Sequence, residues 1–96
     1  MATYILLLKY TEKGVKNIKE SPSRLDAARK FFKENGAELK DFYLTTGRQD
    51  ALCICEVPSD DLLAKLVLAI AAQGNVTTET IRAFTEAEYR KIAASI

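Results

Sequence analysis

Two strand-length segments with apolar side chains at consecutive positions constrain the fold of this chain more than any other feature. Residues 3–10 read TYILLLKY and residues 51–57 read ALCICEV, so both faces of each segment are largely apolar. A strand that is apolar on both faces lies in the interior of a sheet, with a neighbouring strand on each side. The sequence therefore predicts two central strands.

Two other segments have the composition of edge strands, because one face of each is more polar. In 38–46, strict alternation places Phe42 and Leu44 on one face, opposite Leu39, Asp41, Tyr43 and Thr45. The segment 75–84 is rich in Thr and Val, and its more polar face carries Thr78, Thr80 and Arg82. Both segments are predicted to lie at the edges of the sheet.

Three segments have apolar residues at helical spacing between recognisable end signals: 22–35, 60–73 and 86–95. We expect Ser21 to be the N-cap of the first, with Pro22 at its first helical position and the basic side chains, Arg24 included, largely on its solvated side. Ser59 is the expected N-cap of the second. The third opens with the capping box Thr85-x-x-Glu88.

The predicted order of elements is β-α-β-β-α-β-α, which is the order of a ferredoxin-like βαββαβ sandwich with an extra C-terminal helix. Right-handed crossovers place the first two helices on one face of an antiparallel sheet ordered 4-1-3-2. A chain of 96 residues is long enough for one such domain and too short for two. We therefore expect an α+β fold with a single domain, 1–96.

In this topology no helix covers the second face of the sheet. We expect Tyr4, Leu6 and Leu8 on that open face, together with the outward residues of 51–57, and a patch of this size exceeds what a monomer usually exposes. The sequence therefore predicts a homodimer, or a higher homo-oligomer, formed through the open sheet face. The alternative is a monomer whose C-terminal helix folds across it.

The chain contains no histidine, which excludes Ser-His-Asp and Cys-His mechanisms. Cys53 and Cys55 are two positions apart in a predicted strand, where the backbone does not permit a disulfide between them. Two thiolates without further ligands rarely hold a metal. We expect free buried thiols, no metal, no cofactor and a reducing, cytoplasmic location.

The net charge is only +1, so the chain as a whole does not attract nucleic acid or an anionic membrane. Residues 9–33 are locally basic, with eight basic and three acidic side chains. RNA-binding sheets stack bases on aromatic side chains, and the segment 50–57 has none. No nucleic-acid partner is expected. No membrane partner is expected either, because no secretory signal or apolar segment of about 20 residues is present.

The polar residues of the two edge strands form the candidate ligand site, with Tyr43, Thr80 and Arg82 as its leading members. We expect them on the open face, on both sides of an apolar strip. Arg82 is suited to hold a carboxylate or enolate, and Tyr43 to donate a hydrogen bond or a proton. The alternative is that these residues form the polar rim of a dimer interface.

Three further features have structural and functional interpretations. We interpret Gly47 as a residue with positive φ and Asp50 as a hydrogen-bond acceptor for the turn backbone. Glu56, at the end of an apolar strand, is interpreted as a solvated carboxylate, with a role as a base as the alternative. Residues 21–24 are interpreted as a helix start, with binding of an anion as the alternative.

Four segments carry a resemblance to a known family: YILLLKYT at 4–11, KNIKESP at 16–22, the Gly47-x-x-Asp50 turn and GNVTTETIRAFT at 74–85. Together they resemble the GYD domain family over almost the whole chain. The resemblance implies a ferredoxin-like fold, sheet-mediated dimers of the dimeric α/β-barrel superfamily and small-molecule binding, with no established reaction. The aromatic position of the family's turn signature is Gln49 in this chain.

Two function classes follow. The first is a small-molecule-binding or regulatory module that forms homo-oligomers. The alternative is a cofactor-free enzyme of the dimeric α/β-barrel type, in which Tyr43, Arg82 or Glu56 orients and activates a small organic substrate.

Overall fold

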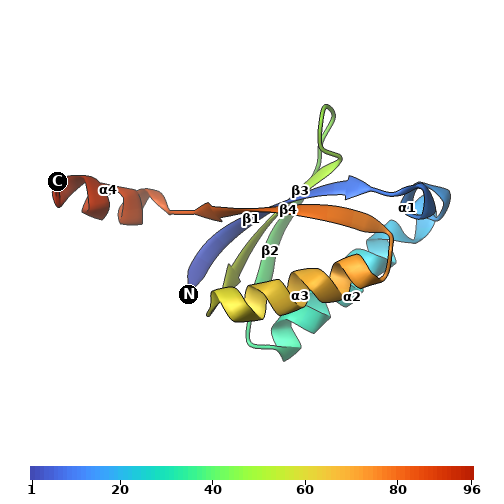
Figure 1. Ribbon diagram of the computed structural model, residues 1–96, viewed down its shortest axis with the longest axis horizontal. Coiled ribbons are helices and arrows are strands. Elements are labelled where there is room, and N and C mark those ends of the chain that lie inside the picture. The colour runs from blue at the N-terminus through green and yellow to red at the C-terminus, as the bar shows by residue number, and fades with distance from the viewer.

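The computed structural model describes residues 1–96 and shows a four-stranded antiparallel sheet with two long helices on one face (Figure 1). The strands lie in the order β2-β3-β1-β4, which is the predicted 4-1-3-2 order read from the other edge. Their bounds are β1 Ala2–Tyr10, β2 Glu38–Leu44, β3 Ala51–Val57 and β4 Val76–Ala83. The helices are α1 Glu12–Lys16, the 3-10 turn η1 Ile18–Glu20, α2 Ser21–Glu34, α3 Asp60–Ala72 and α4 Glu86–Ala94. The α+β ferredoxin-like fold with an added C-terminal helix is confirmed.

The register of the sheet defines its two faces. In an antiparallel pair, directly opposite residues share a face, and Leu6 lies opposite both Cys53 and Thr80. The helix-covered face therefore carries Tyr4, Leu6 and Leu8 of β1 and the buried Ala51, Cys53, Cys55 and Val57 of β3. The open face carries the alternate residues: Ile5, Leu7, Leu52 and Ile54.

The prediction that Tyr4, Leu6 and Leu8 lie on the open face is therefore wrong. When both faces of a strand are apolar, the sequence pattern cannot tell which of them packs against the helices. The structure shows that Tyr4 is buried and donates a hydrogen bond from its hydroxyl to the carboxylate of Asp60, the first residue of α3. This contact joins the start of α3 to the sheet.

A β-bulge in β2 changes which of its residues share a face. Leu39 lies opposite Cys55 and Phe42 lies opposite Cys53, so Lys40 is an extra residue between them. Leu39 and Phe42 therefore both point toward the helices, whereas strict alternation predicted them on opposite faces. Asp41 and Tyr43 remain on the open face, opposite Ile54 and Leu52.

The helix ends agree with the sequence in two of three cases. Ser59 accepts a hydrogen bond from the Leu62 amide, and Thr85 and Glu88 form the predicted capping box. Ser21 is not an N-cap, because η1 leads directly into α2 and Ser21 already has helical angles (φ −54°, ψ −44°). No helix of the structure has the length and apolar character needed to span a bilayer.

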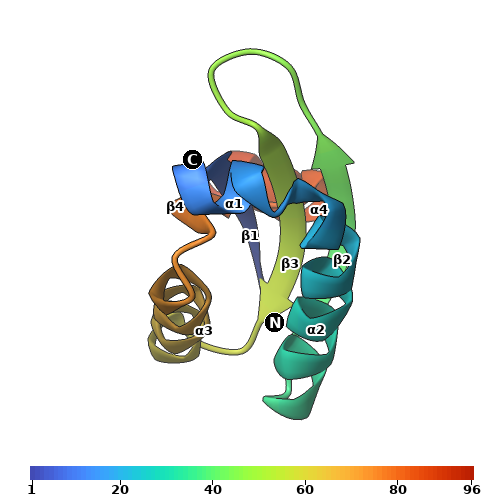
Figure 2. The same cartoon turned by 90° about the vertical axis from the view of Figure 1, so that its right-hand side faces the viewer.

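The C-terminal helix does not fold across the open face. It extends beyond the end of the sheet, away from the body of the domain (Figure 1). Tyr89 and Ile92 are exposed along it, and Ile96, which follows its end, is exposed as well. The two long helices cover one side of the sheet and leave the other bare (Figure 2), so the monomeric arrangement with a covering C-terminal helix is not what the chain adopts.

The segment that follows β1 is fixed to the loop that follows α3. The Thr11 amide donates to the Asn75 carbonyl at 3.0 Å, and the Lys13 ammonium donates to the Gln73 carbonyl at 2.8 Å. At Gly14 the two backbones approach so closely that a Cβ atom would lie 2.1 Å from the Asn75 carbonyl oxygen. Only glycine fits there.

We expect Gly14→Ala to lower the free energy of unfolding by about 1–3 kcal/mol, because the added methyl group forces the two backbones apart. Urea denaturation followed by circular dichroism measures this. Lys16→Ala, an exposed position of the same short helix, is the control and is expected to change stability by less than about 0.5 kcal/mol. Equal urea midpoints for Gly14→Ala and the wild type would show that the backbones at Gly14 and Asn75 can move apart without loss of stability.

Candidate functional site

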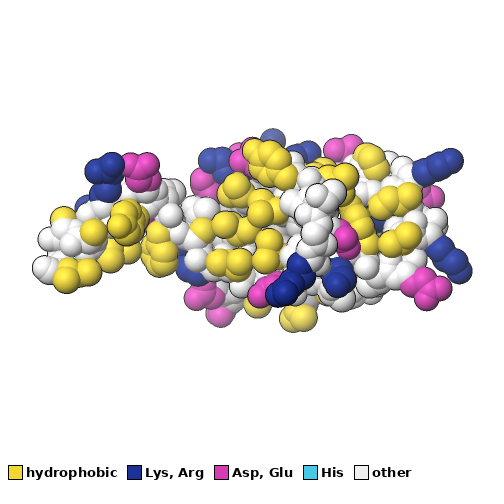
Figure 3. All heavy atoms as spheres, turned by 90° about the horizontal axis from the view of Figure 1, so that it is seen from above, with side chains coloured by type: hydrophobic (Ala, Val, Ile, Leu, Met, Phe, Trp, Pro, Cys, Tyr) yellow, Lys and Arg dark blue, Asp and Glu magenta, His cyan; other side chains and the backbone are white.

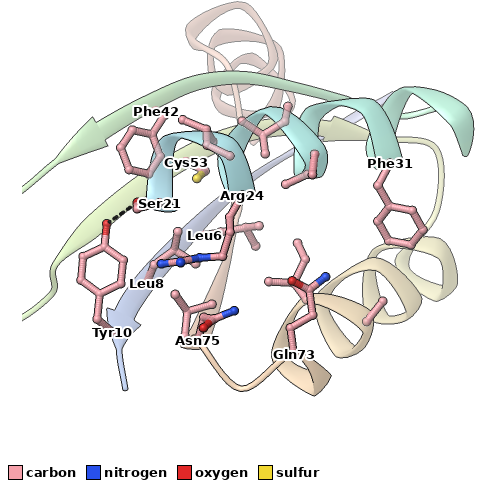
Figure 4. A pocket seen from close by; sticks show the side chains of 17 residues that line it. Leu6, Leu8, Tyr10, Ser21, Arg24, Phe31, Phe42, Cys53, Gln73 and Asn75 are labelled. Carbon is pink, nitrogen blue, oxygen red and sulfur yellow. Dashed lines mark hydrogen bonds between the residues drawn. The ribbon is translucent and has the colours of Figure 1, made fainter. Parts of the chain in front are cut away.

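A cavity of about 310 Å³ lies between α2, α3 and the helix-covered face of the sheet (Figure 4). Of the 17 residues that line it, 13 are hydrophobic. Its volume is at the lower end of the range for small-molecule sites, about 300–1,000 Å³. We call it the helix–sheet cavity.

Small side chains on both helices explain why this space is not filled. Ala27 and Ala28 of α2 and Ala69 of α3 line the cavity, where larger residues would close it. Leu6 and Leu8 of β1 also line it. The cavity therefore follows directly from the sequence of the two crossover helices.

The polar lining residues include Arg24, Ser21, Gln73 and Asn75, and the Tyr10 hydroxyl joins them (Figure 4). The hydroxyls of Tyr10 and Ser21 are 3.5 Å apart. The Arg24 side chain extends from α2 into the cavity, and its Nη1 donates to the Asn17 carbonyl at 2.9 Å. Its Nη2 is buried and has no hydrogen-bond partner.

Cys53 is the one thiol on the cavity wall, and Cys55 is buried in the core outside it. Both cysteines are free, as predicted. Burial raises the pKa of each thiol from 9.0 to about 11. Both therefore stay protonated near neutral pH, and neither is a ready nucleophile or metal ligand.

The structure does not bring the predicted ligand-binding residues Tyr43, Thr80 and Arg82 together. Tyr43 lies on the open face of β2, opposite Leu52, and is exposed. Thr80 and Arg82 lie on the helix-covered face of β4, at the other edge of the sheet. The expectation that the three share one face is wrong, because alternation within one strand does not relate its faces to those of a distant strand.

Arg82 makes contacts within the chain. Its Nη1 donates to the carbonyls of Thr3 and Ala83, and its guanidinium lies 4.2 Å from the centre of the Phe84 ring. These contacts hold the end of β4 against β1. Thr80 lines a shallow groove beside α3, with Leu63 and Leu68.

The turn residues have structural partners. Gly47 has the expected positive φ, 130°. The Asp50 carboxylate accepts a hydrogen bond from the Tyr10 amide at 2.8 Å, so it holds β1 instead of the turn backbone. Glu56 points to the open face and forms an ion pair with Lys40 at 3.0 Å, which raises the pKa of Lys40. Glu56 is thus on the opposite side of the sheet from the cavity.

The sequence contains a signal for the cavity that the predictions above do not include. Arg24, Ala28 and Phe31 are spaced i, i+4 and i+7, which places them on one side of a helix. A basic residue in this apolar stripe is the unusual feature, and the prediction had placed Arg24 on the solvated side. The structure shows all three on the cavity wall.

Comparison with known families identifies the family of the chain. The family model of the GYD domain matches residues 4–93 of the 96-residue chain. No curated protein and no solved structure matches it.

The raised thiol pKa values predict a specific pH dependence of stability. The folded state favours the protonated thiols, so their contribution is fully present below pH 9 and is lost as the pH rises toward 11. We expect a loss of up to about 2–3 kcal/mol per thiol. Urea denaturation between pH 8 and pH 11 measures it.

The double variant Cys53→Ala/Cys55→Ala is the control. It is expected to lose this part of the alkaline destabilisation and to keep the part that belongs to Tyr4, whose pKa is raised by its hydrogen bond to Asp60. The same slope of stability against pH in the wild type and the double variant would refute the assignment to the thiols.

Proposed function

The chain belongs to the GYD domain family, and we propose that it is a small-molecule-binding module of a homo-oligomer, with its ligand in the helix–sheet cavity. The observation that carries the proposal is the cavity itself, which has an apolar wall and a few polar groups that converge on it. Small-molecule sites have this character.

The physical argument is that an apolar wall exposed to water is stabilised when an apolar ligand covers it. The helix–sheet cavity is partly open to solvent, so its apolar wall is in contact with water, and covering apolar surface gains about 25 cal/mol per Å². The helix–sheet cavity measures about 310 Å³, so an apolar occupant that restores the missing contacts stabilises the folded chain.

The wall of the cavity favours binding over acid–base catalysis. It carries no carboxylate, and its thiol, Cys53, is held protonated. A cofactor-free enzyme, the alternative expected from the sequence, needs a base close to the substrate. No observation at the cavity specifically supports that alternative.

The homo-oligomer is supported by the open face of the sheet. Hydrophobic side chains gather in the middle of this face, and charged side chains lie toward its edges (Figure 3). Ile5, Leu7, Leu52 and Ile54 occupy the two central strands there. A second copy of the chain, related by a two-fold axis, presents the same apolar centre and covers it. A cytoplasmic location is part of the proposal, because both cysteines are free thiols.

We expect 1-octanol, a neutral probe with an apolar chain, to bind the wild-type protein in the helix–sheet cavity. Ala69→Phe fills the cavity and is expected to weaken this binding at least about tenfold, because the ring occupies the space of the probe. Isothermal titration calorimetry measures the affinity.

The matched control is Ala72→Phe, an exposed position of the same helix, which is expected to bind octanol as the wild type does. Circular dichroism checks that both variants fold. No binding by the wild type, or equal binding by Ala69→Phe, would contradict the proposed location of the ligand.

The wild-type protein is expected to sediment as a dimer at micromolar concentration. Leu7→Lys places a charge at the centre of the open face and is expected to give a monomer, because burial of an unpaired charge is unfavourable. Leu68→Lys, at an exposed position of α3 outside this face, is the control and is expected to remain a dimer. A monomeric wild type, or a dimeric Leu7→Lys variant, would overturn the proposed interface.

A further inference from the structure

The guanidinium of Arg24 has one unused donor group inside the protein. Its Nη1 is occupied by the carbonyl of Asn17, whereas its Nη2 is buried without any hydrogen-bond partner. A buried donor without a partner costs free energy, and the cost is larger when the group is charged. Such a group indicates that a partner is missing.

No carboxylate neutralises Arg24. The ion pairs of the structure are Lys30–Glu34, Lys40–Glu56 and Arg90–Glu86, and none involves it. Arg24 is also the only charged residue on the cavity wall. The segment 9–33, from the end of β1 to near the end of α2, has eight basic and three acidic side chains. The surroundings of this group therefore favour an anion.

The Arg24 side chain lies in a largely apolar space. Figure 4 shows the Arg24 side chain extending into the cavity, with the hydroxyls of Tyr10 and Ser21 on one side and the amides of Gln73 and Asn75 on the other. An oxygen acceptor that binds the guanidinium has these neutral groups around it. Beyond them the wall is hydrophobic, with Leu25, Phe31 and Ile70 among its members.

From these observations we propose that the ligand is an anionic amphiphile: an apolar chain or ring that carries one carboxylate-like group. Arg24 binds the anion through its guanidinium, in a charge-assisted hydrogen bond. The hydrophobic wall holds the apolar part of the same molecule. This inference rests on the proposed function and adds the chemical class of the ligand to it.

Three probes with the same eight-carbon chain test the proposal on the unaltered protein: octanoate, 1-octanol and octylamine. At pH 7 we expect octanoate to bind about 10- to 100-fold more tightly than octanol, because it adds a hydrogen bond to a charged group. Octylamine is expected to bind more weakly than octanol, because its cation meets the like charge of Arg24. Calorimetric titration gives the three dissociation constants.

The outcomes separate the ligand class from the proposed function. Equal affinities for octanoate and octanol would overturn the anionic ligand and leave an apolar binding site. No binding of any of the three would overturn the proposed function, and this inference with it. Tighter binding of octylamine than of octanoate would also overturn the inference.

The variant Arg24→Met tests whether Arg24 causes the preference for octanoate over octanol. We expect this variant to lose the preference for octanoate while its affinity for octanol stays within about twofold of the wild type, which shows that the cavity is intact. Arg48→Met, in the exposed turn between β2 and β3, is the matched control and is expected to keep the preference. A preference for octanoate that persists in Arg24→Met would overturn the role of Arg24. If that variant does not fold, the three probes on the wild type still decide the ligand class.

Discussion

The packing of α2 and α3 against the apolar face of β1 and β3 is the contact on which the rest of the structure depends. Leu6, Cys53, Cys55 and Val57 of the sheet and Phe32, Leu63 and Leu66 of the helices form the buried core. The two helices fill this face only partly, because the helix residues that line the helix–sheet cavity include several alanines, whose side chains are small. They leave the other face bare. Both proposed surfaces, the cavity and the open face, are consequences of this one packing arrangement.

Strand β1 connects these two surfaces. Leu6 and Leu8 point to the cavity, and Ile5 and Leu7 point to the open face. The turn between β2 and β3 supports the same strand, because the Asp50 carboxylate binds the Tyr10 amide and the Asp50 amide donates to the Leu8 carbonyl at 2.9 Å. The Gly47-x-x-Asp50 turn therefore positions Tyr10 at the cavity, and this is a structural role for it.

The fold was predictable from the sequence because its signals are local and consistent. Apolar character on both faces identified β1 and β3 as central strands, and Ser59, Thr85 and Glu88 marked helix starts. The sequence does not predict which face of β1 packs against the helices, since residues of similar hydrophobicity occupy both faces. The bulge at Lys40 was equally hidden, because one extra residue leaves no trace in a strand with exposed polar positions.

The candidate site was harder to predict than the fold, because it depends on contacts between elements distant in the sequence. Tyr43, Thr80 and Arg82 form a cluster only if their strands present them on the same face, and in the structure they lie on opposite faces. The cavity joins α2, α3 and β1, and its signs in the sequence were small residues on both helices and one basic residue, Arg24, in the apolar stripe of α2.

The most direct test of a ligand cavity between the helices and the sheet is a map of intermolecular nuclear Overhauser effects from bound 1-octanol to the methyl groups of the wild-type protein. The account predicts contacts from the octanol chain to the methyl groups of Leu6, Leu25 and Ile70, which line the cavity. Contacts to Leu7, Leu52 and Ile54 on the open face, without contacts to the first set, would contradict it.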